Sequence, residues 1–172
     1  ELMVENLVDY PPVSVHGAGN WAVLTLDSSQ PHKPGGHIAE VQLEQIAQTL
    51  DSHADKFVLL AMHHSPVEVG CDWLDQPMID NAHRLYALLH AHGHVKGVIT
   101  GHVHQPFTGR WGELLVYSSP SSCVQFKQYC EDFTLSSEPP GYRWLDLHED
   151  GSINTGVEFL QDFTQTPDLD SA

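Results

Sequence analysis

The stretch FVLLAMHHSP, residues 57–66, decides the fold. Its first six residues form an unbroken apolar run of strand length, which is typical of a central strand covered on both faces. A second run, VKGVIT at residues 95–100, also leads into histidines. Between the two runs, Leu85, Leu88 and Leu89 indicate an amphipathic helix that ends near Gly93. Strand, helix and strand in this order predict two parallel neighbours in one sheet.

The same alternation extends outward along the chain. An apolar run at residues 21–26 predicts another strand, and Leu43, Ile46, Ala47 and Leu50 lie on one stripe of a helix that follows it. We expect shorter strands at 114–117, 142–147 and 153–159, a hairpin turn at 149–151, and a loop at 67–77. The prediction is therefore an α/β fold, with one domain over residues 1–160 and a polar, acidic tail over 161–172.

Net charge indicates which partners the protein avoids, and cysteine content indicates the cellular compartment. Seven Lys and Arg against 23 Asp and Glu give a formal charge of −16, which repels phosphate backbones and anionic lipid headgroups. We therefore expect no nucleic-acid partner and no membrane partner, and no apolar run reaches the roughly 18 residues of a membrane span. Three cysteines without a CxxC pair favour a reducing, cytoplasmic location over a disulfide-stapled secreted domain.

Four histidines follow the two central strands at the point where each strand ends. His63 and His64 come directly after the first, and His102 and His104 come after the second, where Gly101 lets the chain turn. The carboxyl ends of parallel strands meet at one edge of an α/β sheet, which is where ligands bind. Since neutral imidazole is a good ligand for transition metals, this coincidence of position predicts a metal site.

Other groups compete for a functional role. The segment HAHGH, residues 90–94, has three imidazoles, but it lies at the opposite edge, where capping of helix carbonyls or plain surface exposure is favoured over metal binding. Cys123 and Cys130 suit soft ligands or a redox pair, although two buried thiols are the favoured interpretation. Asp72 and Trp73 follow His63 closely enough to line its pocket; Trp73 either stacks on a purine or packs within its own loop.

Two pairs of motifs resemble a known family. The segments MHHSP at 62–66 and GHVH at 101–104 resemble the last two motifs of the calcineurin-like metallophosphoesterases. The segments GCDWLDQ at 70–76 and PSSCVQFK at 120–127 are similar to the bacterial 3′,5′-cyclic AMP phosphodiesterase branch of that family. The resemblance covers about residues 21–160.

The resemblance implies a β-sandwich flanked by helices (α/β/β/α) that carries two divalent metal ions. It places His63 and His102 on one ion and His104 on the other, as catalytic residues, and leaves His64 as the less favoured ligand, on the substrate side with His104. The implied reaction is hydrolysis of the 3′ phosphoester bond of cyclic AMP to give 5′-AMP, by in-line attack of a metal-bound hydroxide. Imidazole ligands suit Mn, Fe or Zn better than Mg or Ca.

The family's opening carboxylate motifs are not found in the chain. Asp51-Ser52-His53 has the letters of the first motif, Asp-x-His, but lies at a helix end rather than after a strand. We therefore expect the chain to be the C-terminal part of the enzyme, to bind at most one ion and to be inactive alone. The alternative is a non-catalytic metal-binding or dimerising module, in which an exposed sheet edge pairs two copies into a homodimer.

Overall fold

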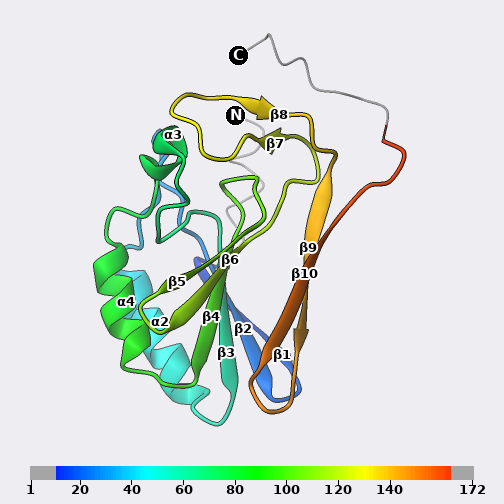
Figure 1. Ribbon diagram of the computed structural model, residues 1–172. Coiled ribbons are helices and arrows are strands. Elements are labelled where there is room, and N and C mark those ends of the chain that lie inside the picture. Colours follow the sequence, from blue (N-terminus) through cyan, green and yellow to red (C-terminus); the bar gives the residue numbers. More distant parts are fainter. Residues whose placement is uncertain (1–10, 164–172) are drawn as a thin grey trace.

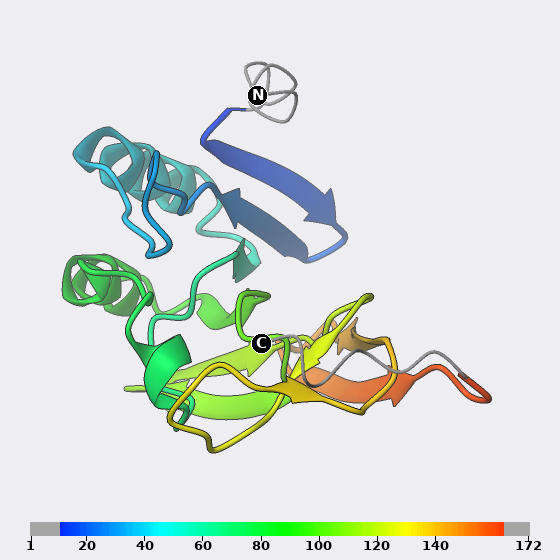
Figure 2. The same ribbon diagram turned by 90° about the horizontal axis from the view of Figure 1, so that it is seen from above.

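The computed structural model describes residues 11–163, which form stacked layers (Figure 1). Two helices cover one face of a six-stranded sheet, and a two-stranded ribbon lies on its other face; the view from above separates these layers (Figure 2). The elements in chain order are β1 (Val13–Ala18), β2 (Trp21–Leu26), α2 (Glu40–Ser52), β3 (Phe57–Met62), α3 (Asp72–Asp75), α4 (Ala82–His90), β4 (Val95–Thr100), β5 (Phe107–Trp111), β6 (Leu114–Ser118), β7 (Gln125–Phe126), β8 (Leu135–Ser136), β9 (Gly141–Leu147) and β10 (Ile153–Phe159).

The large sheet has the order β1-β2-β3-β4-β6-β5. Strands β2, β3, β4 and β6 are mutually parallel, whereas β1 and β5 pair antiparallel at the two edges. The helices α2 and α4 make the crossovers between the first three parallel strands, as parallel pairing requires. All four parallel strands therefore point their carboxyl ends toward the same edge.

The core lies between this sheet and the two helices. Ile46 and Leu50 of α2 and Leu85 and Leu89 of α4 are fully buried against strand residues such as Leu60. Burying side chains of this size stabilises the fold by roughly 1.5–3 kcal/mol each before the loss of chain entropy is counted. The core therefore holds β3 and β4 rigidly, and with them the loops that follow them.

The ribbon of β9 and β10 is tied to the other face of the sheet by polar contacts. The Arg143 guanidinium donates to the carbonyls of Ser118 (2.8 Å) and Phe107 (3.1 Å), which belong to β6 and β5. The Trp21 indole N–H donates to the carbonyl of His148 in the turn of the ribbon, at 2.7 Å. Residues 11–163 thus contribute three layers of the expected α/β/β/α sandwich.

The α/β prediction is confirmed, and the predicted central strands match β2, β3 and β4 residue for residue. Four strands were missed: β1 and β5 are edge strands with several exposed residues, and β7 and β8 have two residues each. The expected loop at 67–77 contains one helical turn, α3. Most of the expected tail, residues 164–172, and the first ten residues of the expected domain lie outside the described residues. Within residues 11–163, the structure has no helix that is both long and apolar enough to cross a bilayer.

Candidate metal centre

The register of the sheet brings the predicted histidines together. Met62, the last residue of β3, pairs with Leu26 of β2 and with Thr100 of β4, so the loops after these strands begin at the same level. The carbonyl of His63 then accepts hydrogen bonds from the backbone N–H groups of Gly101 (3.1 Å) and His102 (3.0 Å). The two loops are therefore joined through their backbones directly beside the imidazoles.

His63 and His102 form the centre of the cluster. Their ring centroids are 5.1 Å apart, and His63 Nε2 lies 3.2 Å from His102 Nδ1. Two imidazole nitrogens that share one ion, each at about 2.1 Å and about 90–109° apart, lie about 3.0–3.4 Å from each other. The observed separation therefore fits two ligands of a single ion as well as it fits a hydrogen bond.

The other ring nitrogen of His102 is an orphaned polar atom. Nε2 is buried and has no hydrogen-bond partner among the described residues. Burial, with the neighbouring imidazoles of His64, His63 and His104, lowers the pKa of His102 to about 4. The pKa values of His63 and His104 are also lowered, mainly by burial. These imidazoles are therefore neutral near pH 7 and have lone pairs for a cation.

His64 is committed to hydrogen bonds with the protein. Its Nε2 donates to the carbonyl of Pro34 at 3.0 Å, because a carbonyl oxygen only accepts, and its Nδ1 then accepts from the Ser28 hydroxyl at 2.8 Å. The residue is 5% exposed, and burial lowers its pKa. Although its ring lies within the same cluster as His63 and His102, neither nitrogen has a free lone pair in this arrangement.

His104 stands apart from the cluster and is oriented separately. Its backbone is in the left-handed region, with φ of 47°, and its Nδ1 donates to the carbonyl of Val124 at 2.9 Å. The Phe126 ring stacks on the imidazole at 4.4 Å with an interplanar angle of 2°. A histidine whose Nδ1–H is held by a carbonyl presents Nε2 as a ligand atom, which is the usual support of a metal-binding imidazole.

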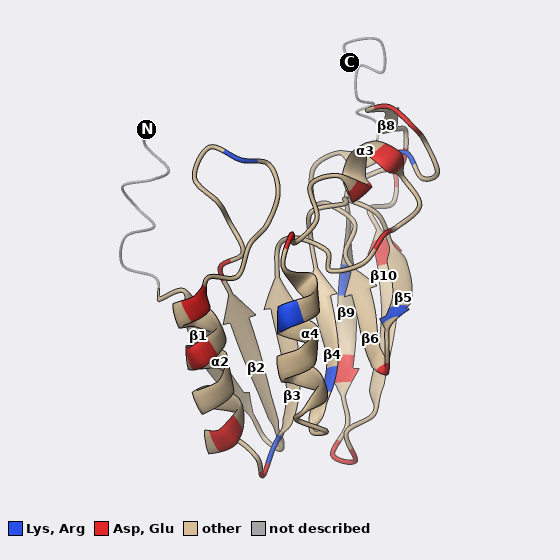
Figure 3. Cartoon of the chain, turned by 90° about the vertical axis from the view of Figure 1, so that its left-hand side faces the viewer, with Lys and Arg blue, Asp and Glu red and all other residues tan. Residues whose placement is uncertain are grey.

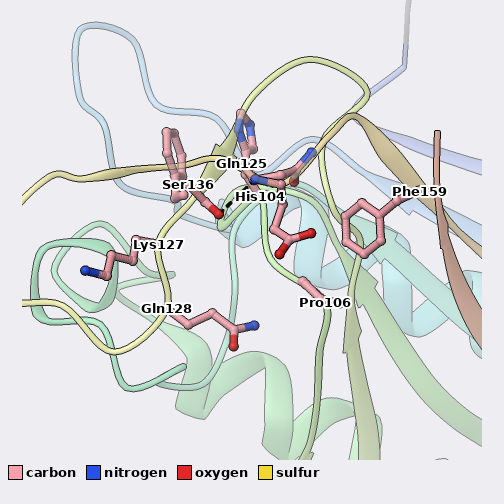
Figure 4. Close-up of a pocket in the computed structure, with 9 residues that line it drawn as sticks. His104, Pro106, Gln125, Lys127, Gln128, Ser136 and Phe159 are labelled. Atoms are coloured by element: carbon pink, nitrogen blue, oxygen red, sulfur yellow. Dashed lines mark hydrogen bonds between the residues drawn. The ribbon is translucent and has the colours of Figure 1, made fainter. Parts of the chain in front are cut away.

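A pocket of about 410 Å³ opens beside His104, within the usual size range of small-molecule sites (Figure 4). Pro106 lines it below His104, and Phe159 of β10 closes one side. Gln125, Lys127 and Gln128 bring polar and cationic groups to its wall. Glu138 adds a carboxylate to the same wall. Further acidic residues lie on α2 (Figure 3).

The donor atoms of this histidine cluster are suited to a transition-metal ion. The cluster is made of three imidazoles, from His63, His64 and His102, whose ligand atoms all lie within 4.8 Å of one another, and it contains no carboxylate. An all-nitrogen set of this kind favours borderline transition metals over the hard cations Mg²⁺ and Ca²⁺.

Of the competing histidines at residues 90–94, His92 caps a helix, whereas Nε2 of His94 is buried with no hydrogen-bond partner among the described residues. His92 Nδ1 donates to the carbonyl of Leu88 in the last turn of α4, at 2.8 Å. His90 stacks on Tyr86 of the same helix, with ring centroids 5.5 Å apart. Asp51, from the segment that imitates Asp-x-His, lies beside His92 (3.3 Å) at the end of α2 and not in the cluster.

The cysteine interpretation needs correction. Cys123 is exposed and Cys130 is half-buried, so the expected pair of buried thiols is wrong; the fully buried thiol is Cys71. Its partner is Cys130, 59 residues along the chain. The sequence does not reveal this contact, because it depends on how residues 127–130 fold back onto the loop that carries Cys71.

Trp73 and Asp72 lie on α3, above the strand ends. The Trp73 ring packs against Phe126 (4.9 Å) and Phe133 (5.0 Å), and its indole N–H is buried with no partner among the described residues. Asp72 is exposed, and no hydrogen bond of its side chain is seen in the described part of the chain. The loop-packing interpretation of Trp73 therefore has direct contacts to support it.

Sequence reasoning did not single out two supports of the site. Ser28, 1% exposed, holds His64, and Phe126 holds the plane of His104. A signal for Ser28 was available, because it follows strand β2 as closely as His64 follows β3. Phe126 gave no such signal, since its contact with His104 depends on how the loop after β6 folds back.

Comparison with known proteins gives relatives across almost the entire chain. No family model matches it. The chain is 38% identical over 170 residues to the 3′,5′-cyclic adenosine monophosphate phosphodiesterase CpdA of Pseudomonas aeruginosa, covering 99% of this chain and 60% of that protein. It is 40% identical over 151 residues to the CpdA protein of Escherichia coli K12, covering 88% and 55%. The chain thus spans somewhat more than half the length of these relatives.

Solved structures agree at the level of the fold. A dimetal phosphatase from Danio rerio superposes with a TM-score of 0.54 at 13% identity, covering 84% of this chain and 58% of that one. The GAP50 protein of Plasmodium gives a TM-score of 0.50 at 13% identity, covering 87% and 54%. The shared fold is that of the metallophosphoesterases, with the HHSP and GHVH segments at its strand ends, and the chain is similar in sequence, at up to 40% identity, to proteins named as cyclic AMP phosphodiesterases.

Proposed function

We propose that this chain supplies the imidazole part of the metal site of a cyclic nucleotide phosphodiesterase, which hydrolyses the 3′ phosphoester bond of 3′,5′-cyclic AMP to give 5′-AMP. The observation that carries the proposal is the 3.2 Å contact between His63 and His102 at the ends of adjacent parallel strands. The names of the sequence relatives support the choice of substrate. We place the protein in the cytoplasm, where thiols remain reduced.

Each residue has a separate task in this proposal. His63 and His102 hold one divalent ion, Mn, Fe or Zn, and His104 faces a second. His64 does not act as a ligand but anchors the loop after β3 to Ser28 and Pro34. The pocket beside His104 receives the nucleotide, with the exposed Asp72 as a further substrate contact. Trp73 supports this region by packing on Phe126 and does not stack on the base.

Charge explains why a metal is required. The formal charge of −16 opposes the approach of an anionic phosphodiester, and the imidazoles are neutral near pH 7 because burial lowers their pKa values. Divalent ions supply the positive charge that attracts the phosphodiester and activates water toward it. The protein's part is to hold the ligand atoms fixed and to keep each imidazole unprotonated.

The composition of the cluster limits what the 172 residues do alone. Two cations a few Å apart repel each other strongly unless a carboxylate lies between them, and the cluster has none. We therefore expect the isolated chain to bind at most one ion and to show no turnover. Equilibrium dialysis against Mn²⁺ and an assay for 5′-AMP measure both; two bound ions with rapid turnover would contradict the expectation and point to a carboxylate such as Asp27.

The function is tested in the complete gene product. We expect His102→Ala to abolish Mn²⁺-dependent conversion of cyclic AMP to 5′-AMP, because it removes the imidazole whose nitrogen lies at the centre of the cluster. His92→Ala is the matched control, since His92 caps α4 at the opposite edge of the sheet and should keep parental activity. Parental kcat in the His102 variant, or equal losses in both, would refute the assignment.

A non-catalytic module that binds metal or dimerises is the second candidate. The edge strand β1 pairs only with β2 within the described residues, and Val15 on it is 37% exposed. Pairing of two such edges would give a homodimer. Light scattering at increasing protein concentration separates the candidates: a stable dimer without turnover in the complete gene product would favour the module.

A further inference from the structure

Two thiols lie in contact at the rim of the site. Cys71 Sγ is 3.3 Å from Cys130 Sγ, and no disulfide joins them. A disulfide bond measures about 2.0 Å, so the sulfurs need to approach by about 1.3 Å. Reacting atoms that are held about 3–3.5 Å apart are already close to an attacking geometry. The pair therefore needs little movement to react.

The backbone around each thiol keeps the pair together. The N–H of Asp72 donates to the carbonyl of Cys130 at 3.2 Å, which joins the two segments beside the sulfurs. The Asp75 carboxylate accepts from the N–H groups of Val69 (2.7 Å), Gly70 (3.0 Å) and Cys71 (3.0 Å). The loop that carries Cys71 is thus fixed by four hydrogen bonds.

The two sulfurs differ in access. Cys71 is fully buried, and burial raises the pKa of its thiol, so it is shielded from reagents in solution. Cys130 is half-buried, in a loop whose neighbour Tyr129 is 81% exposed. A partly exposed attacking thiol with a shielded second thiol in contact is the arrangement in which a mixed disulfide is resolved within the molecule.

We propose that Cys71 and Cys130 form a site of reversible oxidation, closed to an intramolecular disulfide by small-molecule disulfides such as oxidised glutathione. In the first step Cys130 loses its proton to water and attacks one sulfur of the oxidant, whose S–S bond breaks to release one thiolate. Cys71 then loses its proton and attacks Cys130 Sγ, expelling the second thiolate. Two protein thiols are oxidised, and the oxidant is reduced to two thiols.

The bond would link two segments that frame the candidate metal centre. Cys71 begins the turn that carries Trp73, whose ring contacts Phe126 at 4.9 Å. Phe126 in turn stacks on His104, and it precedes Cys130 by four residues. Oxidation therefore fixes the loop of residues 69–75 to the segment that orients His104. This inference concerns thiol chemistry and does not depend on the proposed phosphodiesterase activity.

The experiment exposes the folded 172-residue chain to oxidised glutathione, with Cys123→Ser as the background because that exposed thiol reacts independently. Remaining thiols are alkylated, and the protein and its peptides are weighed by mass spectrometry. We expect a loss of two hydrogens in mass and a peptide that links Cys71 to Cys130, both reversed by a reductant. Accumulation of a mixed disulfide at Cys130 without the linked peptide would overturn the proposal.

Two further variants separate the roles of the thiols. Cys71→Ser should leave Cys130 as a persistent mixed disulfide with glutathione, because the resolving thiol is gone. Cys130→Ser should leave Cys71 unmodified, because that sulfur is buried. Since Cys130 is not fully buried, its variant tests the proposal even if Cys71→Ser fails to fold. Modification of Cys71 at the parental rate in the Cys130 variant would contradict the order of attack.

Discussion

The lowered pKa of His102 predicts that the metal-free protein loses stability in mild acid. Burial and the imidazoles of His64, His63 and His104 lower this pKa from 6.5 to about 4. The folded state therefore binds a proton less readily than the unfolded chain does. The stability contributed by neutral His102 is fully present above the unfolded pKa and is lost as the pH falls toward the folded one.

The magnitude follows from the size of the shift. One pKa unit corresponds to about 1.4 kcal/mol, so the full difference between 6.5 and about 4 is worth roughly 3 kcal/mol. At about pH 4.5 the unfolded chain is protonated at this site and the folded protein is mostly not, which gives a loss of about 2.5 kcal/mol relative to about pH 7. Below about pH 3 this residue causes almost no further loss.

The assay is urea unfolding in the presence of a chelator, at about pH 7 and about pH 4.5. The other cluster histidines also have lowered pKa values, so the parent loses more in total, and His102→Gln isolates one contribution by removing it. The exposed His16 on β1 provides the control, and His16→Gln should retain the parental loss. An equal acid loss in the parent and in His102→Gln would refute the reasoning.

Two further predictions concern the loops that frame the centre. Asp75→Asn removes an oxygen that accepts two backbone hydrogen bonds, so we expect a loss of about 2–3 kcal/mol in the free energy of unfolding. The exposed Asp72→Asn is the control and should lose less than about 0.5 kcal/mol. Equal urea midpoints for the two variants would contradict this prediction. Gly36→Ala places a Cβ 2.7 Å from the His64 ring and should lower the free energy of unfolding by about 1–3 kcal/mol. Gly17→Ala, whose Cβ meets no atom within 4 Å, is the control and should be neutral. Thermal melting measures both, and equal melting temperatures would contradict the prediction.

Local pattern was sufficient for the central strands and for the helices between them. Residues 57–62 are apolar without interruption, as a strand buried on both faces requires, and residues 95–100 are mostly apolar, with Lys96 and Thr100 as the exceptions. The edge strand β5 alternates between half-buried and exposed positions, but with five residues and Gly109 at its centre this pattern is too short and too weakly apolar to stand out. Strands β7 and β8 have two residues each, too few for any periodicity.

The place of the site was predictable for a topological reason. Neighbouring parallel strands end at one edge of the sheet, so histidines directly after two such strands had to meet there. His63 and His102 do meet, at 3.2 Å. The sequence pattern also separated them from His90 and His92, because those residues follow a helix and lie at the opposite edge.

The sequence by itself determined the α/β class, the edge that holds the histidines and the chemical class of the cluster, because each depends on periodicity, chain order and residue type. Only the tertiary structure decided that both nitrogens of His64 are occupied, that Phe126 stacks on His104, and that Cys71 meets Cys130. These contacts join residues 20 or more positions apart. For the last two, no strand register brings the partners together, so the sequence pattern could not predict them. Side-chain packing between loops selects such partners, and it depends on shape and distance, which a linear pattern does not carry.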